Sequence, residues 1–268
     1  MPGFFWIIIA MGVGLILVWA RELWQRQSRT VRSQETGVTD AEADILRRNV
    51  PIYQRLPVDL QKQLQNLSKR FIEHKKFVPC GDMEEVTEEM KWTIAGNAAL
   101  LRFNREFRYP FGRVYSVLIY PSSFFNSLEE RAELLDGEAW PTGSVVIAWD
   151  EARKSARDLR DGKNLIVHEF AHQLDLENGP ADGLPEIDPA QLCTWARVLS
   201  TEFHNLRTAS ATGKRTVLDQ YGAEEPAEFF AVVTEAFFER PMRLQQRHPE
   251  LYDQLRLFYR VDPGRWVV

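Results

Sequence analysis

The chain has 268 residues, of which 44% are hydrophobic and 12% aromatic, so it can bury one good core or two small ones. Its formal net charge of -5 gives no reason to expect binding of nucleic acid. The two cysteines, Cys80 and Cys193, fit no metal-ligand spacing and are too few for a disulfide-rich scaffold. We therefore expect both to be reduced and to lie in the core or at its boundary.

The first 20 residues predict a transmembrane anchor. Residues 3–20 carry no charge, and a helix of this length is about 27 Å long, just enough to cross a hydrocarbon core. No Lys or Arg precedes this run, whereas several arginines follow it: Arg21, Arg26, Arg29 and Arg32. Because positive residues flank the cytoplasmic end of membrane helices, we expect a single-pass protein of the cytoplasmic membrane whose remaining residues face the cytoplasm.

Two other interpretations of this segment stay open. It could be a signal peptide cleaved after Ala20, since Val18 and Ala20 are tolerable around a cleavage site. The lack of a basic region before the segment and the arginine-rich flank after it argue against export. It could also be a buried core helix, although its length favours a membrane span.

Residues 21–50 are polar and charged, and we expect a connector that is partly helical at best. Residues 51–268 are expected to form the folded domain. Its hydrophobic patterns predict two strands, over 114–120 and 144–149, and helices over the following ranges: 59–77, 87–104, 192–206, 226–239 and 251–259. Helices around a small mixed sheet indicate the α+β class.

One motif in the middle of the chain carries the most functional information. His168-Glu169-Phe170-Ala171-His172 has the spacing H-E-x-x-H, which puts two imidazoles about one turn apart on one face of a helix, where both can reach one ion. Glu169 projects next to the same ion and can hold and deprotonate a metal-bound water. Zinc lowers the pKa of that water toward about 7 and polarises a carbonyl, so the set predicts a peptide-hydrolysing site. The alternative is an amphipathic helix with two histidines on a partly wet face.

A tetrahedral catalytic zinc needs three protein ligands and one open position. The other histidines, His74, His204 and His248, stand in charged or polar surroundings without ligand-like spacing, and we expect them at the surface. Glu228 and Glu235 are better candidates, because they share one face of the predicted helix over 226–239, which is apolar nearly all round. Buried carboxylates are costly unless they are paired or bound to a metal.

Each of these glutamates has another possible role. Glu228 falls in the first helical turn, where a carboxylate complements the helix dipole. Glu235 lies two turns in, where it could pair with Arg240 or Arg243, or accept a hydrogen bond from a ligand histidine. We rank Glu228 as the ligand and Glu235 as the support of a ligand histidine, but the spacing alone does not decide the order.

Three blocks of sequence together resemble the Mlc titration factor A family of zinc peptidases: H-E-F-A-H-Q-L-D at 168–175, N-G-P-A-D-G-L-P at 178–185, and Y-G-A-E-E-P-A-E-F-F at 221–230. The likeness extends upstream to V-L-I-Y-P at 117–121 and G-S-V-V-I-A-W at 143–149, and thus covers roughly residues 50–260. That family resembles the gluzincin-type metallopeptidases and shares a catalytic core with anthrax lethal factor. The resemblance therefore implies a zincin-like domain.

The resemblance also implies residue roles. His168, His172 and Glu228 match the family's zinc ligands, one ion per chain, and Glu169 matches its general base. Tyr221 matches a tyrosine suited to donate a hydrogen bond to the oxyanion. On the sequence alone Tyr221 could also be an ordinary half-buried aromatic residue.

Asp175 and the loop over 178–185 match the family as well. Asp175 could accept a hydrogen bond from a ligand histidine, or could be a polar residue at the end of its helix. The loop contains turn formers, for which a structural role is the default: Asn178, Gly179, Asp182, Gly183 and Pro185.

By resemblance the protein is a zinc-dependent peptidase, with an aminopeptidase as one form, acting on peptide or protein substrates. The alternative is a binding protein that sequesters a transcriptional regulator, since the family's name records capture of a sugar-responsive repressor. A pure binding module has no need of Glu169 beside two histidines, although one protein could do both. A purely structural zinc would want a fourth Cys or His ligand, and none is placed to serve. The family members compared are soluble and lack the anchor, so their partners and location do not transfer directly.

Overall fold

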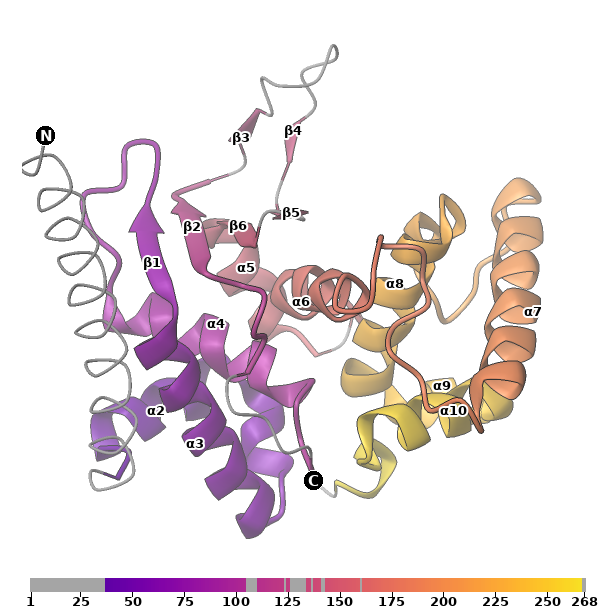
Figure 1. The fold of residues 1–268 in the computed structure, drawn as a ribbon, viewed down its shortest axis with the longest axis horizontal. Coiled ribbons are helices and arrows are strands. Elements are labelled where there is room, and N and C mark those ends of the chain that lie inside the picture. The colour runs from indigo at the N-terminus through magenta and orange to yellow at the C-terminus, as the bar shows by residue number, and fades with distance from the viewer. Residues whose placement is uncertain are drawn as a thin grey trace, which may run out of the picture. The chain divides into compact units, whose positions relative to one another are not determined.

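A computed structural model describes residues 37–104, 110–122, 124–125, 134–135, 137–140, 143–159 and 161–266 (Figure 1). Thr39–Val268 form one compact unit, separate from Met1–Val38. The predicted anchor over residues 1–20 lies outside the described residues. Among those described, no helix is long and apolar enough to span a membrane.

The compact unit starts with a helix in the segment expected to be a connector. This helix, α2 (Asp40–Asn49), begins with a reciprocal capping box between Thr39 and Glu42. It buries apolar side chains against α4 (Glu88–Leu100), where a Cβ added at Gly96 would lie only 2.6 Å from a methyl group of Leu46. The chain between 21 and 50 therefore contributes to the core from Asp40 onward. A short 3-10 helix, η1 (Pro51–Arg55), connects α2 to α3 (Val58–His74).

The helix predicted over 59–77 ends three residues early, because the chain turns into an edge strand. Lys75 is extended and buried, and its ammonium donates hydrogen bonds to the carbonyl oxygens of Phe111 at 2.5 Å and Val114 at 2.8 Å. Lys76 and Phe77 then belong to β1 (Lys76–Pro79) rather than to the helix. Apolar periodicity cannot distinguish a last helical turn from the first residues of a short strand.

A four-stranded mixed sheet has the order β1-β2-β6-β5. The central strands β2 (Ser116–Tyr120) and β6 (Ser144–Ala148) are parallel to each other, and β1 is parallel to β2. The edge strand β5 (Gly137–Trp140) is antiparallel to β6. A separate antiparallel pair joins β3 (Phe124–Phe125) to β4 (Leu134–Leu135). The sheet and its surrounding helices agree with the α+β class predicted from the sequence.

Helix α6 (Leu165–Asp175) lies in the middle of the unit (Figure 1). On one side are the sheet, α3, α4 and α5 (Trp149–Arg157), a helix that the sequence patterns did not predict. On the other side is α8 (Pro226–Glu239), followed by the remaining helical elements: α7 (Leu192–Ala211), η2 (Gln220–Ala223), α9 (Pro241–Arg247), α10 (Pro249–Tyr259) and η3 (Pro263–Arg265).

Aromatic side chains fix α6 against the first half of the unit. The ring of Phe170 meets the rings of Phe71 and Phe111 edge to face, with centroids 5.4 and 4.8 Å apart.

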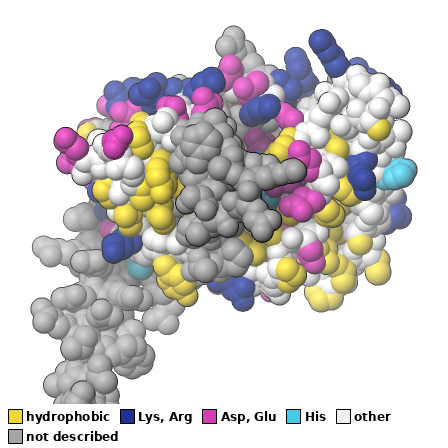
Figure 2. All heavy atoms as spheres, turned by 90° about the horizontal axis from the view of Figure 1, so that it is seen from above, with side chains coloured by type: hydrophobic (Ala, Val, Ile, Leu, Met, Phe, Trp, Pro, Cys, Tyr) yellow, Lys and Arg dark blue, Asp and Glu magenta, His cyan; other side chains and the backbone are white. Residues whose placement is uncertain are grey.

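The surface is of mixed charge, since acidic and basic side chains are interspersed over the described part of the face in Figure 2. Both cysteines are free. Cys80 is half-buried, in agreement with its expected place at the core boundary, whereas Cys193 is exposed on α7, where the expectation was wrong.

Candidate metal centre

Three candidate ligands from two helices converge where α6 packs on α8. One ligand atom each of His168, His172 and Glu228 lies within 4.8 Å of the others. Nε2 of His168 is 3.2 Å from Nε2 of His172 and 2.9 Å from Oε2 of Glu228, and Nε2 of His172 is 3.4 Å from Oε1 of Glu228. The ligands predicted from two distant motifs of the sequence therefore lie together in one site.

Helix α6 holds its histidines in place through its N-terminal cap. The side chain of Asn164 accepts a hydrogen bond from the backbone N–H of Val167, and the helical spacing then brings His168 and His172 to the same face. The helix ends at Asp175, three residues before the turn formers Asn178 and Gly179. The cap, together with the buried ring of Phe170, leaves α6 little freedom to turn about its axis.

Glu235 contacts the other side of the His168 ring. Nδ1 of His168 is 2.7 Å from Oε1 of Glu235, and Oε2 of Glu235 accepts a 2.6 Å hydrogen bond from the backbone N–H of Asn164. A carboxylate at Nδ1 favours the tautomer whose proton is on Nδ1 and whose Nε2 lone pair is directed at Glu228 and His172. The structure thus places Glu235 against His168 and not in an ion pair with Arg240 or Arg243.

Glu169 lies beside the three ligands but forms no hydrogen bond with them among the described residues. Only 5% of Glu169 is exposed. Burial raises the pKa of the Glu169 carboxyl to about 7, even though His168 and His172 act in the opposite direction. A carboxyl group of this kind can exchange a proton near neutral pH.

Tyr221 stands over His168 at the solvent side of the site. Its ring centroid is 5.9 Å from that of His168, and the residue is 48% exposed. Burial of the hydroxyl, and then the charge of Glu228, raise the pKa of Tyr221, so the hydroxyl keeps its proton at neutral pH. Asp219 accepts a 2.9 Å hydrogen bond from the backbone N–H of Tyr221 and pairs with Lys163, which links this turn to the loop before α6.

Asp175 does not support a ligand histidine, contrary to one of the two roles expected for it. Its Oδ2 accepts a 2.7 Å hydrogen bond from the backbone N–H of Gly183, and no described histidine donates to it. The reason is its position as the last residue of α6, where a carboxylate turned toward the following loop fixes that loop. Asp175 therefore ties the 178–185 loop to the end of the helix.

The remaining histidines lie away from the three ligands. His204 is exposed, as expected. His74 and His248 are half-buried and not fully at the surface: Nδ1 of His74 is 2.7 Å from the carbonyl of Arg70, and Nδ1 of His248 is 2.9 Å from Oε2 of Glu202. These contacts give both residues a role in joining or ending helices.

The donor set fits a divalent metal of the zinc type. Two imidazole nitrogens and one carboxylate are ligands that zinc accepts in catalytic sites. With metal–nitrogen bonds of about 2.0–2.1 Å, neighbouring ligand atoms of a tetrahedron are about 3.3 Å apart. The 3.2 Å between the two Nε2 atoms is close to this value. The ligand side chains also remain 12–14% exposed, so the site can be reached from solvent.

Comparison with known proteins supports this chemistry. The model of a family described as glucose-regulated metallo-peptidase M90 matches residues 22–260. The chain belongs to this family. The match covers the metal-site helices α6 and α8 together with most of the described fold, and it identifies the protein as a member of a metallopeptidase family.

Several curated proteins are similar over most of their length. An uncharacterised protein of Synechocystis is 34% identical over 230 residues, which are 82% of this chain and 83% of that protein. Mlc titration factor A of Escherichia fergusonii is 30% identical over 80% of this chain and 84% of its own. Mlc titration factor A of Yersinia pestis is 31% identical over 80% of this chain and 83% of its own. The resemblance to the Mlc titration factor A family is thereby confirmed.

The structure adds several buried polar residues that the sequence reasoning did not assign to the site. Nδ2 of Asn164 donates hydrogen bonds of 3.0 Å to both Asn97 and Glu239, and the latter lies 4% exposed at the far end of α8. An Asn directly before an apolar helix is a recognisable N-cap signal. Nothing in the spacing of Asn97 or Glu239 indicates that either meets it.

Proposed function

We propose that the protein is a zinc-dependent peptidase with a zincin-like catalytic domain and one zinc ion per chain. His168, His172 and Glu228 would hold the ion. The observation that carries the proposal is the buried carboxylate of Glu169 beside these ligands. A site that only stores or displays a metal does not need such a group, whereas hydrolysis needs a base next to the attacking water.

A zinc ion held by His168, His172 and Glu228 would supply Lewis acidity, which would polarise the substrate carbonyl and make a water molecule acidic enough to attack near pH 7. Glu169 accepts the proton of the attacking water, which its raised pKa suits. Tyr221 keeps its hydroxyl proton and donates it in a hydrogen bond to the oxygen that gains negative charge. Glu235 fixes the orientation and tautomer of His168.

The substrate we propose is a peptide with a free amino terminus. Glu224 and Glu225 are exposed and close enough to Tyr221 for their charges to raise its pKa, so the entrance of the site is negatively charged. A terminal ammonium group would be attracted there, and a blocked terminus would not. Comparison of a free peptide with its N-acetylated form tests this: equal kcat/KM for both would contradict the aminopeptidase assignment.

Replacement of the base tests the catalytic assignment directly. Glu169→Gln should keep the fold and the metal but lower peptide turnover by about 10² to 10⁴-fold, since it removes only the group that accepts the proton. A chelator should abolish turnover of the unaltered protein, and added zinc should restore it. Glu85→Gln, at an exposed glutamate outside the site, is the matched control and should keep full activity.

Unchanged turnover in Glu169→Gln, with bound metal demonstrated, would contradict the peptidase proposal. It would favour the alternative function, a protein that binds a transcriptional regulator. The similar proteins of Escherichia fergusonii and Yersinia pestis carry the name Mlc titration factor A, which is compatible with such a partner for those proteins.

A further inference from the structure

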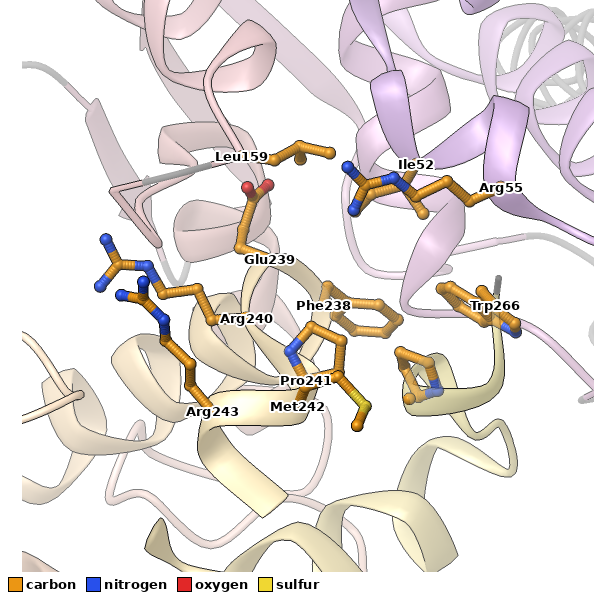
Figure 3. Close-up of a pocket in the computed structure, with 12 residues that line it drawn as sticks. Ile52, Arg55, Leu159, Phe238, Glu239, Arg240, Pro241, Met242, Arg243 and Trp266 are labelled. Carbon is orange, nitrogen blue, oxygen red and sulfur yellow. The ribbon is translucent and has the colours of Figure 1, made fainter. Parts of the chain in front are cut away.

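A pocket lies at the C-terminal end of α8, beyond the last turn of the helix that carries Glu228 and Glu235. Its volume is about 310 Å³, near the lower limit of small-molecule sites. Three arginines line it: Figure 3 shows Arg240 and Arg243 on one side and Arg55 reaching in from the opposite side. The pocket thus collects positive charge from two separate parts of the chain, η1 and the start of α9.

Two of these arginines, Arg55 and Arg243, lie in the lining without a carboxylate partner in the described part of the chain. The acidic group in the lining is Glu239, whose Oε1 accepts the hydrogen bond from Asn164 and whose Oε2 is buried without a hydrogen-bond partner among the described residues. Burial raises the pKa of Glu239 well above its usual value of 4.5, although the charge of Arg55 acts in the opposite direction.

The rest of the lining is apolar. Phe238 is buried, and its ring is stacked with that of Trp266, with centroids 6.3 Å apart. Pro241 and Met242 complete this wall (Figure 3). Planar guanidinium groups bind carboxylate and phosphate groups in a bidentate manner, and the stacked rings offer a surface to an apolar group. The arginine side of the pocket therefore suits an anionic group, and the Phe238–Trp266 side suits an apolar group of the same ligand.

We propose that this pocket binds a small organic anion, with a carboxylate or phosphate group held by the arginines and an apolar group against Phe238 and Trp266. We further propose that the bound anion changes the zinc affinity of the metal centre. This second part rests on the proposed zinc site, whereas the first does not.

The connection to the metal centre is a continuous path of buried contacts. Glu239 accepts a 3.0 Å hydrogen bond from Asn164, Asn164 donates a 2.6 Å hydrogen bond from its backbone to Glu235, and Glu235 lies 2.7 Å from Nδ1 of His168. Arg240 adds a second contact with the segment before α6 that contains Asn164, because a Cβ added at Gly162 would lie 2.8 Å from Cδ of Arg240. A ligand that moves Glu239 or Arg240 therefore acts on the residues that cap α6 and orient His168.

Titration calorimetry on the metal-free full chain tests the pocket. Phenyl phosphate and benzoate are the probes, and at least one should bind at one site with a Kd on the order of 1 mM or tighter. Arg243→Gln should weaken binding about ten-fold or more, because it removes one charge-assisted contact at an exposed position that does not support the fold. Arg247→Gln, on the same helix but outside the lining, is the matched control and should not change the Kd.

Three results would overturn the pocket assignment. One is the absence of saturable binding of both probes. Another is equal binding by Arg243→Gln and the unaltered protein, which would place the anion elsewhere. The third is binding of inorganic phosphate as tight as that of phenyl phosphate, which would show that the apolar wall contributes nothing.

The same titration on zinc-loaded protein tests the coupling. A coupled anion should bind with a Kd that differs by about five-fold or more between the two forms, and zinc affinity should change by the same factor. Asn164→Asp keeps a good N-cap residue but loses the amide donor to Glu239, so the difference should vanish. Arg243→Gln distinguishes binding in the pocket from direct ligation of zinc by the anion, because it should weaken only binding in the pocket. Equal anion affinity with and without bound zinc would contradict the coupling and leave the anion pocket standing.

Discussion

Two glutamates on one helix face meet different nitrogens of the same histidine. Glu228 lies 2.9 Å from Nε2 of His168, and Glu235 lies 2.7 Å from Nδ1. Their spacing of two helical turns places them on opposite sides of the ring, so only Glu228 also reaches His172. Burial acts to raise the pKa of Glu228, but the neighbouring imidazoles of His168 and His172 outweigh it and lower this pKa to about 2, so Glu228 is an anion that can bind a cation.

This difference predicts unequal effects of two isosteric substitutions on metal affinity. Glu235→Gln should weaken zinc binding about 10-fold to 100-fold, as expected for a residue that only orients a ligand. Glu228→Gln should weaken it by more than this range, because it removes a ligand. Competition with a chromogenic chelator measures both affinities. A larger loss in Glu235→Gln than in Glu228→Gln would require the two roles to be exchanged.

At this scale the sequence was informative where chemistry is tied to a short motif. The H-E-x-x-H spacing predicts the placement of His168 and His172 because a helix fixes it. It could not tell which nitrogen of His168 each glutamate faces, since this depends on how α8 crosses α6. For the same reason Asp175 was expected near a histidine, whereas its carboxylate meets Gly183.

Among the elements around the site, the loop over 178–185 packs directly on the start of α8. Gly183 has a φ of +79°, a backbone conformation that strains residues with a side chain. A Cβ at this position would also overlap the carbonyl group of Pro226, two residues before the candidate ligand Glu228. The loop and the first turn of α8 therefore depend on a glycine here.

Gly183→Ala should destabilise the fold by about 1–3 kcal/mol and weaken the metal site, because the loop must move away from Pro226. Gly179→Ala in the same loop is the matched control: Gly179 has open space around it and should tolerate the change. Urea unfolding and zinc affinity report the two effects. Equal stability of both variants would contradict the close contact.

The elements also show where local patterns lose their power. Apolar spacing predicted α3, α4, α8 and both central strands near their observed positions. It did not predict α2 and α5. Both helices are short and mostly polar, so their amino-acid composition is like that of a connecting segment. Both helices become stable through packing onto neighbours far away in the chain, and no window of sequence contains that contact.

For the whole molecule, we propose that residues 1–20 anchor the peptidase in the cytoplasmic membrane with Thr39–Val268 on the cytoplasmic side. The intact chain should then sediment with membranes and resist extraction by high salt, because burial of the apolar segment outweighs surface electrostatics. Deletion of residues 1–20 should give a soluble and folded protein. Release of the intact chain by salt alone would contradict the anchor.

A reporter fused to the carboxyl terminus tests the orientation of the chain separately. It should be active in the cytoplasm, because the arginines that follow the apolar segment favour that side. Activity confined to the outside would contradict the topology and favour a cleaved signal peptide.

Metal analysis of the purified protein tests the metal centre itself. We expect about one zinc ion per chain, bound by His168, His172 and Glu228. His168→Ala and His172→Ala should lose the ion while remaining folded by circular dichroism, and His204→Ala, at an exposed histidine on α7, should keep it. Stoichiometric zinc in both His168→Ala and His172→Ala would contradict the metal centre and the peptidase mechanism built on it.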